Sequence, residues 1–107
     1  MKILFSDNFL KEAETLSKKY KLLKSDLQQA IHEIEASKDL GVSLGLNLFK
    51  KRVKNSSIPT GKSGGFRVII FAQIEDKIIL ISIFSKTEKE SLSDAELSAI
   101  LQKYLER

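Results

Sequence analysis

Two apolar runs in the second half of the chain limit most strongly what the sequence can fold into. Phe66–Ile74 and Lys77–Phe84 are rich in β-branched residues and are separated only by Glu75-Asp76, which predicts an antiparallel β-hairpin. Both alternating faces of each run are apolar. Strands with this pattern are covered on both sides, so we expect a sheet packed between two layers.

The segments before the hairpin predict one of these layers. An amphipathic helix is expected after Ser6 or Asp7, each a candidate N-cap, and a second helix is expected from the capping-box pattern Ser25-Asp26-Leu27-Gln28. Few residues join the two helices, which predicts an antiparallel helical hairpin. Their apolar stripes are Phe9, Ala13, Leu16 and Tyr20, and Leu27, Ala30, Ile31 and Ile34.

The remaining elements complete the expected fold. Lys2–Phe5 is a candidate short first strand, the glycine-containing segment 39–47 is expected to be a loop, and a strand is expected from about residue 46 to Lys54. Ser93-Asp94-Ala95-Glu96 is a second capping box that opens a C-terminal helix. We therefore predict a single α+β domain over residues 1–107, with an N-terminal helical hairpin, a three- to four-stranded antiparallel sheet and a C-terminal helix.

Charge is distributed unevenly along this chain. Residues 40–74 contain six Lys and Arg residues and no acid, whereas the whole chain has a net charge of +4. Such a segment is typical of an anion-binding face, but also of a solvated lysine-rich edge strand. Charge alone favours neither interpretation. The six cations are Lys50, Lys51, Arg52, Lys54, Lys62 and Arg67.

Strand alternation divides these cations into two sets. In the expected strand, Lys50, Arg52 and Lys54 share one face, while Lys51 lies on the other. Residues on the same face of a strand are about 7 Å apart, which is comparable to the phosphate spacing of an extended nucleic-acid strand. A face this cationic is not expected in a dry core.

Several classes of function are disfavoured by residue content. The chain has no cysteine, which excludes disulfides and thiolate metal sites and favours the cytoplasm. Its apolar runs are too short to span a membrane, and residues 40–74 offer no carboxylate for acid–base chemistry or for Mg²⁺. His32 points away from the apolar stripe of its helix, and Gly61-Lys62-Ser63 lacks the upstream glycine and the following helix of a P-loop. We expect no metal and no cofactor.

Cations can nevertheless support RNA cleavage. Lys and Arg bind phosphates and stabilise the negative charge that develops on them, and the attacking nucleophile can be the substrate's own 2′-hydroxyl group. A lysine among other cations can exchange a proton because its pKa is lowered. Binding of nucleic acid without cleavage uses the same charges and remains open.

Three stretches resemble the RelE/HigB superfamily of bacterial type II toxins. They are KNSS at 54–57, GKSGGFRVI at 61–69 and FSKTEK at 84–89, and the expected order of elements also matches. The resemblance implies an endoribonuclease that cuts mRNA in the ribosomal A site. It also implies a cognate antitoxin, which in the HigB-like branch is usually a helix-turn-helix protein.

The resemblance also suggests roles for individual residues. Lys50 and Arg52 would be base or electrostatic groups, and Arg67 would hold the scissile phosphate. Lys54 and Lys62 would contact RNA, and Lys86 lies where relatives place further catalytic groups. Some relatives have an arginine where this chain has Thr87, and residues 88–97 contain neither Tyr nor His, so the proton donor is not assigned.

Two alternatives to this function are retained. One is a ParE-like relative of the same fold that inhibits DNA gyrase by protein–protein contact. The other is an RNA-binding module without catalytic activity. Cleavage of cellular mRNA distinguishes the ribonuclease from both alternatives.

Overall fold

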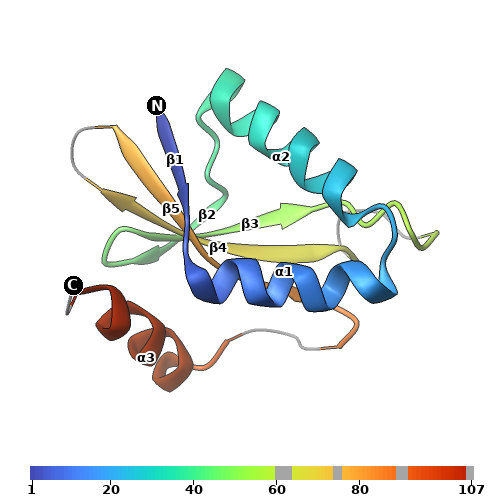
Figure 1. Ribbon diagram of the computed structural model, residues 1–107. Helices are drawn as coiled ribbons and strands as arrows, with labels where there is room; N and C mark the ends of the chain where they lie inside the picture. Colours follow the sequence, from blue (N-terminus) through green and yellow to red (C-terminus); the bar gives the residue numbers. More distant parts are fainter. Residues whose placement is uncertain (60–63, 74–75, 89–91, 106–107) are drawn as a thin grey trace.

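The computed structural model describes residues 1–59, 64–73, 76–88 and 92–105. Eight elements follow one another along the chain (Figure 1). They are β1 (Lys2–Phe5), α1 (Asp7–Lys19), α2 (Leu23–Ser37), β2 (Val42–Gly45), β3 (Leu48–Val53), β4 (Phe66–Gln73), β5 (Lys77–Ser85) and α3 (Asp94–Leu105).

The strands form one five-stranded sheet in the order β1-β5-β4-β3-β2. The three pairs from β2 to β5 are antiparallel, and β1 lies parallel to β5. The α+β class, the helical hairpin and the C-terminal helix are thus confirmed. The expected sheet was too small and wholly antiparallel, whereas the observed sheet is mixed because the N-terminal strand pairs with the last strand.

β2 occupies part of the segment that was expected to be a loop. Val42 and Leu44 alternate with Ser43 and Gly45, but the run is only four residues long and all four are exposed, so this pattern is too short to distinguish a strand from a glycine-containing loop. A tight reversal then leads into β3, and three consecutive residues in it have positive φ: Gly45 (86°), Leu46 (53°) and Asn47 (62°). Glycine and asparagine tolerate this region, and the resulting hairpin places β2 at the edge of the sheet.

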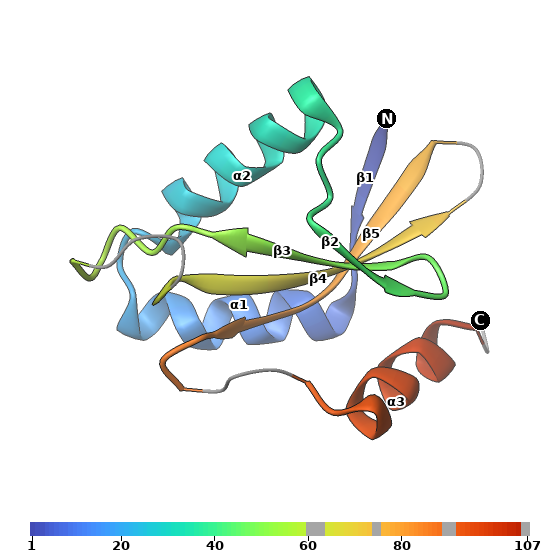
Figure 2. The same cartoon turned by 180° about the vertical axis from the view of Figure 1, so that it is seen from behind.

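The sheet separates two apolar clusters. One contains the buried residues of α1 and α2, including Phe9, Leu16 and Ile34, packed on Val68 and Ile70 of β4. The other packs the apolar side of α3 on the opposite face. Figures 1 and 2 show α3 beside the end of the sheet at which the β2–β3 turn lies, away from the end where β3 leads into the β3–β4 loop. Among the described residues, no helix therefore lies over much of this second face.

Two of the three predicted helix starts are confirmed. Ser6 caps α1 by accepting a hydrogen bond from the Phe9 amide at 2.8 Å. Ser93 and Glu96 exchange the two bonds of a capping box at 3.1 and 3.2 Å. The predicted start of α2 at Ser25 is wrong, because this helix begins at Leu23 without a side-chain cap.

A bulge in β5 lies under α1. Ile69 pairs with Ser82 and Ile70 pairs with Leu80, which leaves Ile81 as an extra residue. Glu12 of α1 satisfies the polar groups at this point, because its Oε1 accepts hydrogen bonds from Ser82 Oγ at 2.7 Å and from the Ile83 amide at 3.3 Å. The bulge therefore connects α1 to the strand that leads into residues 86–88.

Candidate functional site

Arg52 of β3 and Arg67 of β4 lie directly opposite each other in the antiparallel ladder. Opposite residues of such a pair share one face of the sheet. Here it is the face on which α3 packs, because the next pair on the same face, two residues along, is Lys50 with Ile69 of the α3 cluster. The Arg52 side chain is exposed. Arg67 is only 3% exposed, and its Nη1 donates to the Phe66 carbonyl oxygen at 3.2 Å. Burial, and then the charge of Arg52, lower the pKa of Arg67.

The other cations of β3 follow the predicted alternation. Lys50 pairs with Ile69 on the same face as Arg52 and is half-buried. Lys51 is on the opposite face, only 6% exposed, with its Nζ 3.8 Å from a Glu33 carboxylate oxygen of α2. Lys51 is thus part of the packing between α2 and the sheet, and Lys50 and Arg52 face away from this packing.

Lys54 follows the end of β3 and is exposed. Together with Arg52 it lines a cleft of about 310 Å³, and the other wall of this cleft is formed by residues of α2. That wall brings Asp26 and Glu33 close to the basic segment, although no acid occurs between residues 40 and 74. Both Asp26 oxygens are held by Ser56, at 2.6 Å from its Oγ and 2.8 Å from its amide.

Sequence reasoning missed these two acids. Asp26 was interpreted as part of a helix cap, but its carboxylate fixes the start of the β3–β4 loop instead. Thirty residues separate Asp26 from Ser56, and neither local spacing nor composition indicates such a contact. The consequence for the site is that the chain around Lys54 is tied to α2.

The segment after β5 borders the same end of the sheet. The Lys86 amide donates to the Gly65 carbonyl oxygen at 3.0 Å, and the Lys86 side chain is half-buried. This contact places the segment beside the residues that lead into β4 and Arg67. Lys62, the remaining predicted RNA contact, lies outside the described residues.

Tyr20 is a second feature that sequence reasoning did not assign to this region. It was predicted as a core residue and is only 4% exposed, but its hydroxyl group lies 3.4 Å from both Ser85 Oγ and Thr87 Oγ1. These contacts, first that with Ser85, lower the pKa of Tyr20. The end of α1 is thereby joined to the segment that contains Lys86.

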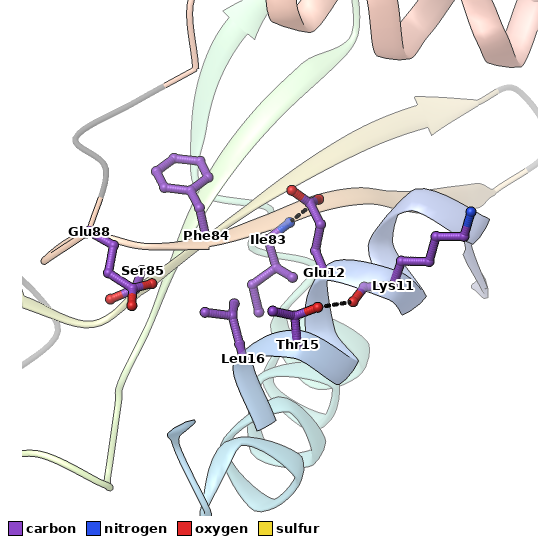
Figure 3. Close-up of a pocket in the computed structure, with 8 residues that line it drawn as sticks. All are labelled: Lys11, Glu12, Thr15, Leu16, Ile83, Phe84, Ser85 and Glu88. Carbon is purple, nitrogen blue, oxygen red and sulfur yellow. Dashed lines mark hydrogen bonds between the residues drawn. The ribbon is translucent and has the colours of Figure 1, made fainter. Parts of the chain in front are cut away.

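A separate cleft of about 380 Å³ lies between α1 and the end of β5 (Figure 3). Figure 3 shows Glu12 pointing toward the β5 backbone at Ile83 and Leu16 pointing toward the same strand. Near it, Glu88 accepts a hydrogen bond from Lys19 Nζ at 2.7 Å. This cleft contains both charge signs and apolar walls, so it lacks the cationic character of the Arg52–Arg67 region. Among the residues that the structure describes, no group of three or more histidines and carboxylates is placed to hold a metal ion.

Comparison with known proteins identifies the class. The chain matches, over residues 1–105, the family described as the RelE toxin of the RelE/RelB toxin-antitoxin system. It is therefore a toxin of a toxin–antitoxin system, a class in which the partner is an antitoxin. Within this class it belongs to the RelE toxin family.

A solved structure agrees with this assignment in fold. It is a mutant of E. coli toxin RelE in the free state, with two arginines replaced by alanine. The two chains share 16% identity, the match covers 95% of each chain, and the TM-score is 0.60. No curated protein matches the sequence. Along the described parts of the chain, no helix is long and apolar enough to cross a membrane.

Proposed function

We propose that this toxin is an endoribonuclease that cuts mRNA on the translating ribosome in the cytoplasm, and that residues 1–107 act as one domain. The observation that carries this proposal is the directly opposed pair Arg52 and Arg67 on the face of the sheet that α3 only partly covers. Lys50 of β3 and Lys54, just past the end of this strand, extend the cationic character. Membership of the RelE toxin family supports the same activity.

The arginine pair suits a phosphate that gains charge during reaction. Cross-strand neighbours lie about 5 Å apart at Cβ, so two guanidinium groups can donate to the two non-bridging oxygens of one phosphate. Arg67 is held in place by burial and by its bond to the Phe66 carbonyl oxygen. Burial and Arg52 both disfavour its charge, and an anion bound between the two arginines would relieve this penalty. Fixed donors of this kind stabilise a transition state without reorganisation.

The proposed reaction is an in-line attack within the RNA. The 2′-oxygen forms a bond to the adjacent phosphorus, the bond from phosphorus to the 5′-oxygen breaks, and the products are a 2′,3′-cyclic phosphate and a 5′-hydroxyl end. We assign Lys50 to the 2′-hydroxyl side as the base that accepts the proton, and Arg52 beside it as an electrostatic group, because a guanidinium group has no site that accepts a proton. Lys86, on the β5 side, is assigned as donor of a proton to the leaving 5′-oxygen, and Lys54 and Lys62 as contacts to neighbouring phosphates.

We also propose a helix-turn-helix protein as the antitoxin. Membership of the RelE toxin family implies that the toxin has an antitoxin partner. The resemblance of the 61–69 segment to the HigB-like branch supports an antitoxin of the helix-turn-helix type. Co-purification of the toxin with the product of a neighbouring small gene, followed by a DNA-binding assay of the complex, tests this partner.

The test of the catalytic proposal is induced expression in a bacterium, followed by primer extension on an abundant mRNA. We expect new codon-aligned 5′ ends that disappear in Arg67→Ala and Lys50→Ala variants and persist in Lys11→Ala. Lys11 is an exposed lysine of α1, so it controls for loss of one positive charge. Intact mRNA accompanied by DNA damage would overturn the proposal in favour of a gyrase inhibitor. An unchanged growth rate with intact mRNA would favour a non-catalytic RNA-binding module.

A further inference from the structure

The connection between α1 and α2 carries a second concentration of positive charge. Residues 15–25 contain four lysines and no acid, and all four lysines are exposed. We call this surface the lysine corner. It consists of Lys18, Lys19, Lys21 and Lys24.

The lysine corner borders the proposed catalytic site in space. The Leu22 amide, between two of the lysines, donates to Ser57 Oγ in the β3–β4 loop at 3.0 Å. Ser25, next to Lys24, lines the same 310 Å³ cleft as Arg52 and Lys54. Both views of the fold show the α1–α2 connection beside the loop that follows β3 (Figures 1 and 2). A single cleft therefore separates the corner from the cations of β3.

Two of the acids near the corner are already engaged. Glu88 bonds Lys19 and raises the pKa of that lysine, and Asp26 has both oxygens on Ser56. Among ion pairs of the described residues, none involves Lys18, Lys21 or Lys24. These three cations lie within seven residues of the chain, at the end of α1, in the connection and in the first turn of α2. Like charges concentrated in this way repel each other. A bound polyanion would relieve this repulsion.

We propose that the lysine corner binds phosphate groups of RNA, so that the RNA footprint runs from Arg52 and Lys54 across the cleft to Lys21 and Lys24. The positive end of the α2 dipole adds to the potential at this corner. The choice of RNA as the polyanion rests on the proposed function. The phosphates belong either to the substrate strand or to the RNA of the ribosome, and these two sources offer the same chemistry.

The test compares two triple variants of the purified toxin with equal charge change. One replaces Lys18, Lys21 and Lys24 by Gln, and the matched control replaces Lys2, Lys11 and Lys38, which are exposed elsewhere. Gln and Lys have similar helix propensities. Binding is measured over a salt series to a 2′-O-methyl RNA oligonucleotide, which lacks the proposed nucleophile, and by co-sedimentation with ribosomes. Because neither readout requires cleavage, failure of the proposed reaction would not affect them.

We expect the corner variant to bind at least 10-fold more weakly at low salt. The slope of log affinity against log salt should become less steep by about 2 for this variant, because three phosphate contacts are lost and each single-strand contact contributes roughly 0.7. Weakening in the oligonucleotide assay identifies the substrate strand, and weakening only with ribosomes identifies ribosomal RNA. Unchanged affinity and slope in both assays, or equal weakening in the control variant, would overturn the proposal. Circular dichroism spectra that match the wild type establish that both variants are folded.

Discussion

Arg52 and Arg67 face each other directly across β3 and β4, with one side chain exposed and the other buried. Two like charges at opposite positions of an antiparallel pair destabilise the sheet. The pair therefore reduces the stability of the free toxin at the place where an anion is proposed to bind.

Replacing Arg52 by Gln should raise the free energy of unfolding by about 0.5 kcal/mol at low salt, while mRNA cleavage is lost. The gain should shrink in high salt, because screening already weakens repulsion between the two charges. Urea denaturation at low and high salt measures both effects. Lys54→Gln is the control, since Lys54 lies beyond the end of β3 and is not opposite Arg67. A loss of stability in Arg52→Gln would show that repulsion does not dominate this pair.

Glu12 should be essential for the bulge in β5. Glu12→Ala leaves Ser82 Oγ and the Ile83 amide without their acceptor, so we expect a loss of about 2 kcal/mol, and roughly half of that for Glu12→Gln. Amide hydrogen exchange at Ile83 should accelerate in the same order. Glu14→Ala on the exposed side of α1 should change stability by less than about 0.5 kcal/mol. Similar stability of the two alanine variants would refute this role.

The Tyr20 hydroxyl should titrate below its ordinary pKa of 10.0, because Ser85 and then Thr87 stabilise the phenolate. For an acid whose pKa is lower in the folded state, the stabilisation is fully present above the unfolded pKa and is lost as pH falls through the folded pKa. The stability of the wild type relative to Tyr20→Phe should therefore rise as pH approaches 10. Phenolate absorbance of the wild type minus that of Tyr20→Phe gives the midpoint. A midpoint that stays unchanged after Ser85→Ala and Thr87→Val substitution would contradict the assigned cause.

Two glycines should respond differently to alanine substitution. A Cβ on Gly65 would collide with the Val53 carbonyl oxygen at the end of β3, so we expect Gly65→Ala to lose about 3 kcal/mol or more. Gly45 has open space around it but a φ of +86°, so Gly45→Ala should lose about 1 kcal/mol from backbone strain alone. Thermal unfolding of the two variants compares these costs. Equal losses would mean that the contact between Gly65 and Val53 is relieved by local movement.

The parts of the fold that local patterns could predict are the covered strands and two of the three helix starts. Phe66–Ile74 was recognised because both of its faces are apolar, and Ser6 and Ser93 because a cap acts over only a few residues. β2 was not predicted in this way, since its run of four exposed residues is short and lies among glycines, and among the described strands its one neighbour is β3. The pairing of β1 with β5 joins residues about 75 apart in sequence, and nothing in the four residues of β1 specifies that partner.

The arrangement of the candidate functional site could be predicted from sequence to about the same extent as the fold. Alternation correctly separated Lys51 from Lys50 and Arg52, because side-chain direction along a strand is a local property. Burial of Arg67 was not predictable, since the alternation gives its face but not what covers that face. The approach of Asp26 to Ser56 depends on the packing of α2 against the β3–β4 loop, and this distance is set only by the complete fold.

The parallel pairing of β1 with β5 has a consequence for synthesis of the toxin. β5 lies between β1 and β4, so the N-terminal strand has no neighbour in the sheet until residues 77–85 have been made. Non-local pairing of this kind delays folding. The nascent chain therefore cannot complete its sheet until residues 77–85 have been made, and a partner present in the cell gains that interval to meet the chain before the toxin is assembled.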